Sequence, residues 1–223
     1  AEQALDVRRV EELAFWRAML SAPFAPLVAG SLDPARDVVG TAGQLALTLP
    51  ASVTALLLTR VSAAFHCGIH EVLLTGLAVA IAEWRRRHGA QGSGAILVDV
   101  EGHGREEPPF GIDLSRTVGW FTTKYPVAVP VGGVSWAQVT AGEPALEPLI
   151  KAAKEALRAL PDGLTYGLLR YLNPESGLSG PDPAIGFNYL GRLGAAELGD
   201  DLWRIDSDGV SVTAAATAVP TPL

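Results

Sequence analysis

The chain has 223 residues, of which 48% are hydrophobic, so it can bury the core of one large domain or of two small ones. Its formal net charge of -7 argues against a phosphate-binding surface, because nucleic-acid binders need clustered lysine and arginine. The single cysteine, Cys67, excludes an internal disulfide framework and is typical of a reducing compartment.

No targeting or membrane segment is predicted. The N-terminal AEQALDVRRVEELAFW is mixed in charge and lacks the apolar core of a signal peptide. The best apolar candidate, Val72 to Trp84, is shorter than the roughly 18 residues that span a bilayer, and it contains Glu83. These features predict a cytoplasmic protein with neither a nucleic acid nor a membrane as its partner.

The first part of the chain is predicted to be mainly helical. Apolar residues recur at helical spacing over Val7 to Leu20. The segment 26–43, rich in Pro and Gly, is expected to be a loop, and the alternating GQLALTLP that follows it a strand. Pro50 is expected at the first position of a helix, and a longer helix is predicted over Ile69 to His88.

The rest of the chain mixes strands and helices. The glycines of GAQGSG precede the strand AILVDV, whereas a phosphate loop needs them after a strand, so they are interpreted as a turn that ends a helix. One helix is expected within Trp136 to Leu160 and a shorter one over Tyr166 to Leu172. AIGFNYLG, LWRID and VSVTAAATAV are predicted to be short strands. This order indicates one mixed α/β unit.

A possible metal cluster, H-C-x-x-H, is formed by His66, Cys67 and His70. Two histidines four residues apart on a helix can share a metal ion. Gly68 is expected to break the helix between them, and no third and fourth ligands stand nearby in the sequence. No metal site is therefore predicted. The sequence also lacks the G-x-S-x-G elbow of one class of serine hydrolases.

The stretch ILVDVEGHGREE ends a hydrophobic run in a cluster of charges. Alternation along a strand places Leu97, Asp99 and Glu101 on one face. With Cα atoms roughly 7 Å apart, the repulsion of the two carboxylates and any burial would each raise a carboxyl pKa, while Arg105 could oppose that shift. Such a carboxylate can serve as a base. The alternative is a strand end that runs into a solvated, charged turn.

Four stretches together resemble the successive signature motifs of epimerization domains of nonribosomal peptide synthetases: VEGHGREE, DLSRTVGWFTTKYPV, PDGLTYGLLRYL and IGFNYLGRL. They cover about Val98 to Leu193, in the family's order. The resemblance implies an α/β fold of the condensation-domain superfamily, a chloramphenicol-acetyltransferase-like lobe with a mixed β-sheet flanked by helices. The active site of such domains lies in a tunnel between two lobes. Condensation domains themselves are a poorer match, since they usually carry G-x-F-x-N-T where this chain has VGWFT.

The resemblance implies inversion at the Cα of an aminoacyl or peptidyl group. That group is a thioester on the phosphopantetheine arm of a peptidyl carrier protein, so the chain itself would bind no cofactor. The reaction needs a base on one face of the Cα, a proton donor on the other and stabilisation of the enolate. The resemblance assigns acid/base chemistry to Glu101, with Asn188 and Tyr189 lining the same site. It implies substrate binding by Gly102, His103, Gly104, Arg105 and Tyr166.

Two departures from the family pattern stand out. The family's other catalytic group, a histidine of H-H-x-x-x-D in the first lobe, is missing, so residues 1–223 are expected to form the C-terminal lobe, with the first lobe absent and the domain continuing beyond Leu223. The family's P-x-x-G-x-G-Y-G motif appears as PDGLTYG, with Thr165 in place of a glycine. Because threonine adopts a positive φ less easily, the turn is expected to be redrawn or the site relaxed.

Two functions therefore stay open. The first is half of an epimerase active site, and the intact VEGHGREE favours it. The second is a catalytically silent domain of the same fold that docks a carrier protein or a tailoring oxygenase such as a cytochrome P450, and the altered PDGLTYG favours it. On either reading the isolated chain is expected to be inactive, because one face of the Cα would have no proton donor.

Overall fold

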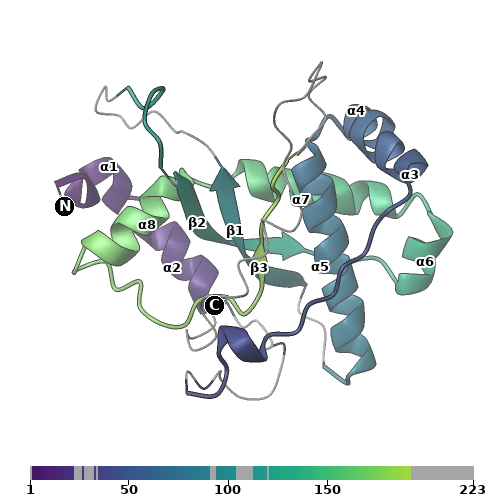
Figure 1. Ribbon diagram of the computed structural model, residues 1–223, viewed down its shortest axis with the longest axis horizontal. Coiled ribbons are helices and arrows are strands. Elements are labelled where there is room, and N and C mark those ends of the chain that lie inside the picture. Colours follow the sequence, from purple (N-terminus) through teal and green to yellow (C-terminus); the bar gives the residue numbers. More distant parts are fainter. Residues whose placement is uncertain are drawn as a thin grey trace. The chain divides into compact units, whose positions relative to one another are not determined.

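The computed structural model describes residues 2–22, 27, 33, 35–90, 94–103, 113–119 and 121–191. The chain divides into two compact units, of which the first comprises Ala1–Leu27 and Pro50–Asn188 and the second Val28–Leu49 and Tyr189–Leu223. The described elements of the first unit, labelled in Figure 1 where there is room, are η1 (Glu2–Leu5), α1 (Val7–Val10), α2 (Leu13–Ser21), α3 (Ala51–Leu56), the π-helix η3 (Leu57–Val61), α4 (Ser62–Phe65), α5 (Ile69–Arg87), β1 (Ala95–His103), β2 (Thr122–Pro130), α6 (Trp136–Ala141), α7 (Leu146–Arg158), α8 (Gly163–Leu172) and β3 (Gly186–Phe187).

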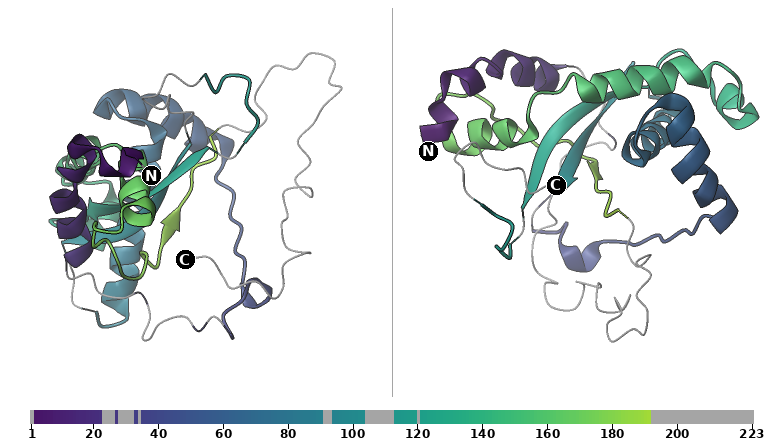
Figure 2. Two further views of the ribbon diagram at one scale, coloured as in Figure 1. Left: turned by 90° about the vertical axis from the view of Figure 1, so that its left-hand side faces the viewer. Right: turned by 90° about the horizontal axis from the view of Figure 1, so that it is seen from above.

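The described strands form one mixed sheet in the order β2-β1-β3. β1 and β2 pair antiparallel, from Ala95 opposite Pro130 to His103 opposite Thr122. β3 pairs parallel to the other edge of β1, with Gly186 opposite Asp99. Helices flank this sheet, as the resemblance to epimerization domains implied. In Figure 2, α1, α2 and α8 lie together on one side of the β1–β2 pair and α5 lies on the other.

One apolar core lies between the sheet and the helices α5 and α7. Alternation along β1 turns Ile96, Val98 and Val100 to this face, and each is at most 1% exposed. Leu74 of α5 and Leu149 of α7 pack against them. Burying a side chain of this size stabilises the fold by about 1.5–3 kcal/mol. The opposite face of β1 is therefore the one that carries Asp99 and Glu101.

A second core joins α2 to α8. Trp16 is fully buried, and its ring centroid lies 5.1 Å from that of Tyr166 and 6.5 Å from that of Tyr125 on β2. A polar contact supports this core, because the buried guanidinium of Arg9 donates a hydrogen bond to the hydroxyl of Thr165 in the first turn of α8. The N-terminal helices are thus tied to the segment that follows α7.

Several predicted elements differ from the observed ones. The helix predicted over Val7 to Leu20 is broken at Glu11 and Glu12, and the one within Trp136 to Leu160 is broken at Gly142, whose φ of +66° ends α6 in the left-handed conformation that glycine favours. α8 begins at Gly163, earlier than predicted, because Asp162 accepts a hydrogen bond from the backbone N–H of Leu164 and caps the helix. The predicted strands LWRID and VSVTAAATAV lie outside the described residues.

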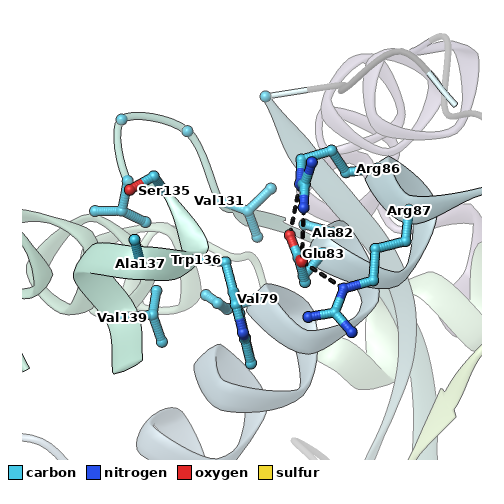
Figure 3. Close-up of a pocket in the computed structure, with 14 residues that line it drawn as sticks. Val79, Ala82, Glu83, Arg86, Arg87, Val131, Ser135, Trp136, Ala137 and Val139 are labelled. Atoms are coloured by element: carbon cyan, nitrogen blue, oxygen red, sulfur yellow. Dashed lines mark hydrogen bonds and ion pairs between the residues drawn. The ribbon is translucent and has the colours of Figure 1, made fainter. Parts of the chain in front are cut away.

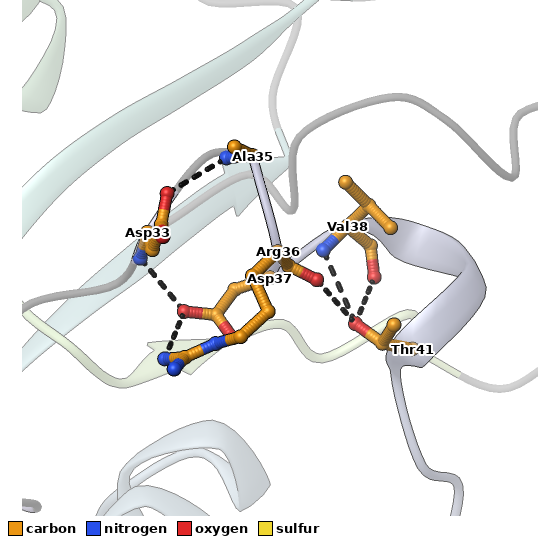
Figure 4. Close-up of polar contacts among 6 residues, drawn as sticks. All are labelled: Asp33, Ala35, Arg36, Asp37, Val38 and Thr41. Atoms are coloured by element: carbon orange, nitrogen blue, oxygen red, sulfur yellow. Dashed lines mark hydrogen bonds and ion pairs between the residues drawn. The ribbon is translucent and has the colours of Figure 1, made fainter.

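The second unit contains a compact turn. Asp33 accepts a hydrogen bond from the backbone N–H of Ala35, and its own N–H donates to the carboxylate of Asp37. The hydroxyl of Thr41 in η2 (Val39–Thr41) bonds the N–H and the carbonyl of Val38 (Figure 4). After it, the predicted strand GQLALTLP is extended but pairs with no described strand.

None of the described helices is by itself long and apolar enough to cross a membrane. One pair, Ala51–Phe65 with Ile69–Arg87, meets the criteria of length and composition, but the two helices are bent by 98° at the break between them.

Candidate functional site

Glu101 lies near the end of β1, on the face turned away from α5 and α7. Its register partner across the β1–β2 pair is Lys124, and its side chain is half-buried. The side-chain amide of Asn188 donates a hydrogen bond of 2.8 Å to Glu101 Oε2. Asn188 therefore holds one oxygen of Glu101 in place, and the other accepts no hydrogen bond from the described residues.

Asn188 reaches Glu101 because it directly follows β3. Phe187, the last residue of β3, pairs with Val100, which precedes Glu101 on β1. Parallel neighbours run in the same direction, so the next residue on each strand also lies side by side. Glu101 and Asn188, far apart in the sequence, thus lie side by side at the end of the β1–β3 pair.

A second acid on the same face of β1 has quite different surroundings. Asp99 is 3% exposed, and its Oδ2 lies 3.0 Å from Lys124 Nζ, an ion pair that lacks the geometry of a directed hydrogen bond. Lys124 Nζ also bonds Asp182 Oδ2 at 2.8 Å, and Asp182 Oδ1 bonds Arg170 Nη2 at 2.7 Å. Two carboxylates and two cations therefore form a continuous chain of alternating charge, which we call the ionic chain.

The pKa values of the ionic chain follow from its burial. Burial raises the pKa of Asp99, and Lys124 offsets this only in part. Burial alone would lower the pKa of Lys124, but the hydrogen bond to Asp182 and the negative charges of Asp182 and Asp99 together outweigh it and raise that pKa. The expected rise of a carboxyl pKa on this strand thus occurs at Asp99, where Lys124 is an opposing cation. Arg105, predicted for that role, lies outside the described residues.

Tyr166, assigned to substrate binding by the resemblance, is 3% exposed in the second core. Its hydroxyl accepts a hydrogen bond of 3.1 Å from Arg170 Nη1, and burial raises the pKa of this phenol to about 12. A substrate could touch the ring only if the packing against Trp16 opened. Tyr166 instead contacts the last member of the ionic chain.

The structure describes only some of the other predicted site residues. A Cβ added to Gly102 would lie 2.6 Å from Thr123 Oγ1, so β2 approaches this glycine closely. His103 ends β1, whereas Gly104 and Arg105 lie outside the described residues. Tyr189 is half-buried and belongs to the second unit. Their assignment to substrate binding and catalysis stays a prediction.

The H-C-x-x-H cluster is split as expected. His66 ends α4 with a φ of +48°, Gly68 precedes α5, and His70 packs edge-on against the ring of Phe187 at 5.2 Å. The described residues contain no group of three His, Cys, Asp or Glu side chains placed to hold a metal ion. Burial raises the pKa of the Cys67 thiol, which therefore resembles a core residue more than a nucleophile.

A pocket of about 820 Å³ lies at the opposite end of the β1–β2 pair from Glu101, between the end of α5 and the start of α6 (Figure 3). Its walls include Val79 and Trp136. Its charged residues are paired with one another, because Glu83 binds both Arg86 and Arg87, at 2.7 and 2.6 Å. These two cations lower the pKa of Glu83 to about 2. None of the residues predicted for catalysis or substrate binding lines this pocket.

Lys124, Asp182 and Arg170 were not among the residues predicted for the site. Asp182 stands in SGPDPAIG, which has the composition of an ordinary turn, and Arg170 ends a helix, where a basic residue is common. Both, however, stand within or beside the family motifs, as does Lys124 in TTKYPV. Charged residues at partly buried positions of a motif are the signal that could have identified them.

Comparisons with known proteins give the same fold. A family model described as Condensation domain matches residues 1–215. The chain is 38% identical over 198 residues to chondramide synthase of Chondromyces crocatus, which is 87% of this chain and 4% of that protein. It is 34% identical over 189 residues to bacitracin synthase 1 of Bacillus licheniformis, which is 83% of this chain and 3% of that protein.

A solved structure extends the match to three dimensions. The epimerization domain from the third module of tyrocidine synthetase B matches with a TM-score of 0.70 and 28% identity, over 86% of this chain and 42% of that chain. The present chain thus spans less than half of that domain and a small part of its curated relatives. Since the family model covers nearly every residue and a solved epimerization domain shares the arrangement of sheet and helices, the chain belongs to the condensation-domain family.

Proposed function

We propose that the chain is the C-terminal lobe of an epimerization domain, which inverts the Cα of an aminoacyl or peptidyl thioester. The observation that carries this proposal is the 2.8 Å hydrogen bond from Asn188 to Glu101. It joins residues of two motifs that resemble those of epimerization domains, and the second carboxylate oxygen accepts no hydrogen bond from the described residues. The match to a solved epimerization domain at 28% identity supports the same reading.

The reaction needs a base that points toward the Cα proton and is accessible to the substrate. Glu101 would take the Cα proton onto its second oxygen, and the electron pair of the C–H bond would pass into the thioester enolate. A donor on the opposite face would then deliver a proton to the Cα and invert it. Asn188, by binding Oε2, would hold the carboxylate in one rotamer toward the substrate. In the reverse direction, Glu101 would act as the donor.

The rest of the site would come from several sources. The opposing proton donor would be a histidine of the first lobe, and we call the chain together with that lobe the two-lobe domain. Tyr189, Gly102, His103, Gly104 and Arg105 would line the approach of the substrate. The substrate would arrive as a phosphopantetheine thioester on a carrier protein, so no cofactor of the domain's own is required. The chain by itself would be inactive.

The alternative is a silent docking domain for a carrier protein or a tailoring oxygenase. The altered PDGLTYG motif was the feature that favoured it. Thr165, however, lies in the first turn of the regular helix α8, and among the described residues other than glycine only His66 has a positive φ. The threonine therefore requires no strained turn, and the altered motif does not weigh against catalysis.

The test is α-proton exchange in deuterated buffer, measured by mass spectrometry on a carrier-bound aminoacyl or peptidyl thioester. The two-lobe domain is compared with its Glu101→Gln variant, which keeps the shape and removes the base. We expect the rate to fall by about 10²–10⁴-fold. The matched control is Glu147→Gln, an exposed glutamate of α7 paired only with Lys151 among the described residues, which should leave the rate unchanged.

Two outcomes would contradict the proposal. Exchange that persists in Glu101→Gln would remove Glu101 from the proton transfer. No exchange in the parent domain across several thioesters would argue against an epimerase altogether and favour the docking domain. A binding assay with the carrier protein and a tailoring oxygenase would then be the next measurement.

A further inference from the structure

β3, which places Asn188, is too short to fix its own position. It has two residues, Gly186 and Phe187, and one further ladder bond runs from the N–H of Asp99 to the carbonyl of Ile185 at 2.8 Å. Sliding a strand by one residue turns each side chain to the opposite face of the sheet. Such a slip would take the amide of Asn188 away from Glu101. Some contact outside the ladder must therefore oppose the slip.

The ionic chain supplies this contact. Asp182 stands four residues before β3 and is bound by Lys124 Nζ at 2.8 Å. The same Nζ lies 3.0 Å from the carboxylate of Asp99, whose backbone is the register partner of Gly186. Lys124 thus joins the strand that carries Glu101 to the segment that leads into Asn188, and it does so at the residue of β1 where β3 pairs.

The other side of Asp182 is held equally firmly. Arg170 Nη2 lies 2.7 Å from Asp182 Oδ1 and donates to the carbonyl of Gly180 at 2.7 Å, while Nη1 donates to the hydroxyl of Tyr166. The arginine side chain is 11% exposed. The chain segment just before β3 is therefore anchored to α8 as well as to the sheet. The buried Tyr166 has a role in this arrangement, since it orients Arg170.

Charge balance makes the arrangement specific. The four members carry two negative and two positive charges, and the side chain of Asp99 is only 4% exposed. Removing Lys124 would leave the carboxylate of Asp99 buried near that of Asp182, with Arg170 as the nearest remaining cation of the ionic chain. A buried charge that loses its partner is strongly unfavourable, so the segment would move or take up a proton.

We propose that Lys124 and Asp182 are positioning residues, which set β3 against β1 and so hold the amide of Asn188 on Glu101. The catalytic consequence of this placement rests on the proposed function, whereas the placement of β3 itself does not. Lys124 and Asp182 act through Asn188 and do not touch the substrate. The ionic chain therefore links residues of the TTKYPV and PDGLTYGLLRYL motifs to the geometry of the catalytic carboxylate.

The first experiment measures the placement of β3 without using activity. Backbone hydrogen–deuterium exchange of the two-lobe domain is followed by mass spectrometry in Lys124→Met and in Asp182→Asn. We expect the peptide that covers 183–190 to exchange at least tenfold faster than in the parent, while peptides from α5 keep their rates. The matched control Lys151→Met removes an exposed lysine that is also ion-paired, and it should change neither. Rates over 183–190 equal to those of the parent would overturn the proposal.

The second experiment tests whether the ionic chain acts through Asn188. Rates of α-proton exchange are compared for Lys124→Met, Asn188→Ala and the double variant. If Lys124 acts by placing Asn188, the double variant should be no slower than the slower single variant, within about twofold. If the rate reductions of the two single variants multiply in the double variant, Lys124 and Asn188 act independently, which would contradict the proposal.

The outcomes separate the two proposals. A parent domain without α-proton exchange would defeat the proposed function, and hydrogen–deuterium exchange over 183–190 would still decide the role of the ionic chain. If Lys124→Met does not fold, Asp182→Asn keeps the Lys124–Asp99 pair and serves for both measurements. Unchanged protection over 183–190 in that variant would overturn the positioning role even if the activity fell.

Discussion

The amide nitrogen of Asn188 lies 2.8 Å from the carboxylate of Glu101, although the two residues are 87 positions apart in the chain. The contact is made where two parallel neighbours, β1 and β3, end together. An amide donor on one oxygen restricts the rotation of the carboxylate without neutralising it. A charge introduced at position 188 would therefore act directly on the carboxylate of Glu101.

Replacing the amide by an acid should shift the pH dependence of the proposed reaction. In Asn188→Asp, a second carboxylate would stand where the hydrogen bond was, and the repulsion would raise the pKa of the pair. Because the base must be deprotonated, the acid limb of the pH–rate profile should move to higher pH. The rate of α-proton exchange at neutral pH should fall about 10- to 100-fold and recover partly as the pH rises.

The control for this shift is Asn188→Ala, which removes the donor but adds no charge. Its rate should fall while its acid limb moves less than that of Asn188→Asp. Identical profiles for the two variants would mean that position 188 does not face Glu101 in the reacting state. Both variants should be measured on the same carrier-bound thioester, so that binding of the carrier is held constant.

The sequence predicted the faces of β1 better than the surroundings of its acids. Alternation correctly placed Asp99 and Glu101 on the face opposite the valine core. It could not predict that one acid would be buried in an ionic chain and the other held by an amide. Asp182 and Arg170 come from segments distant in the sequence, and they are connected to Asp99 through Lys124, which binds both Asp99 and Asp182.

Local sequence patterns likewise predicted some helices and strands correctly and others wrongly. α5 was predicted closely, because a long apolar repeat is bounded by Gly68 and by the left-handed Gly89. GQLALTLP, in contrast, has the alternation of a strand, yet Leu45 and Leu47 are 85% and 86% exposed in an extended segment. Alternation specifies which side chains share a face, but a strand also needs a partner to satisfy its backbone.

Two glycines of α8 should respond to alanine in opposite directions. A Cβ on Gly163 would overlap the ring of Tyr125, whereas a Cβ on Gly167 meets nothing within 4 Å. Gly163→Ala should therefore lower the free energy of unfolding by about 1–3 kcal/mol through overpacking. Gly167→Ala should raise it by up to about 1 kcal/mol, because alanine favours the helix.

Urea denaturation of the two-lobe domain, monitored by tryptophan fluorescence, measures this pair of variants. The ring centroids of Trp16 and Tyr125 lie 6.5 Å apart, so the emission of Trp16 reports on the core that Gly163 adjoins. Equal stability of the two alanine variants would show that the ring of Tyr125 moves aside without cost.

Restoring the family's glycine at position 165 should be harmful in this chain. Thr165 is fully buried, and its hydroxyl accepts a hydrogen bond from the buried guanidinium of Arg9. Thr165→Gly would leave that donor with one partner fewer and put a flexible residue into the first turn of α8. We expect a loss of about 1–3 kcal/mol in the free energy of unfolding.

Serine at the same position is the matched control, because Thr165→Ser keeps the hydroxyl and loses only a methyl group. It should cost less than Thr165→Gly in the same urea titration. A glycine variant as stable as the parent would mean that the carboxylate of Asp162, which already accepts a hydrogen bond from Arg9 Nη1 at 3.4 Å, is a sufficient partner for Arg9.

Glu83, at the pocket between α5 and α6, should make part of the stability sensitive to acid. Arg86 and Arg87 lower its pKa from 4.5 to about 2, so the folded state binds this proton more weakly than the unfolded state does. Its contribution is therefore fully present above pH 4.5 and is lost as the pH falls toward 2. Glu83→Gln should lower the urea midpoint most at neutral pH, and the difference from the parent should shrink below about pH 4.5.

Glu147→Gln removes an exposed acid with a single cationic partner among the described residues, so it should change the midpoint less. A difference between Glu83→Gln and the parent that stays constant from about pH 7 to pH 3 would mean that the glutamate stabilises the end of α5 by packing and not by charge.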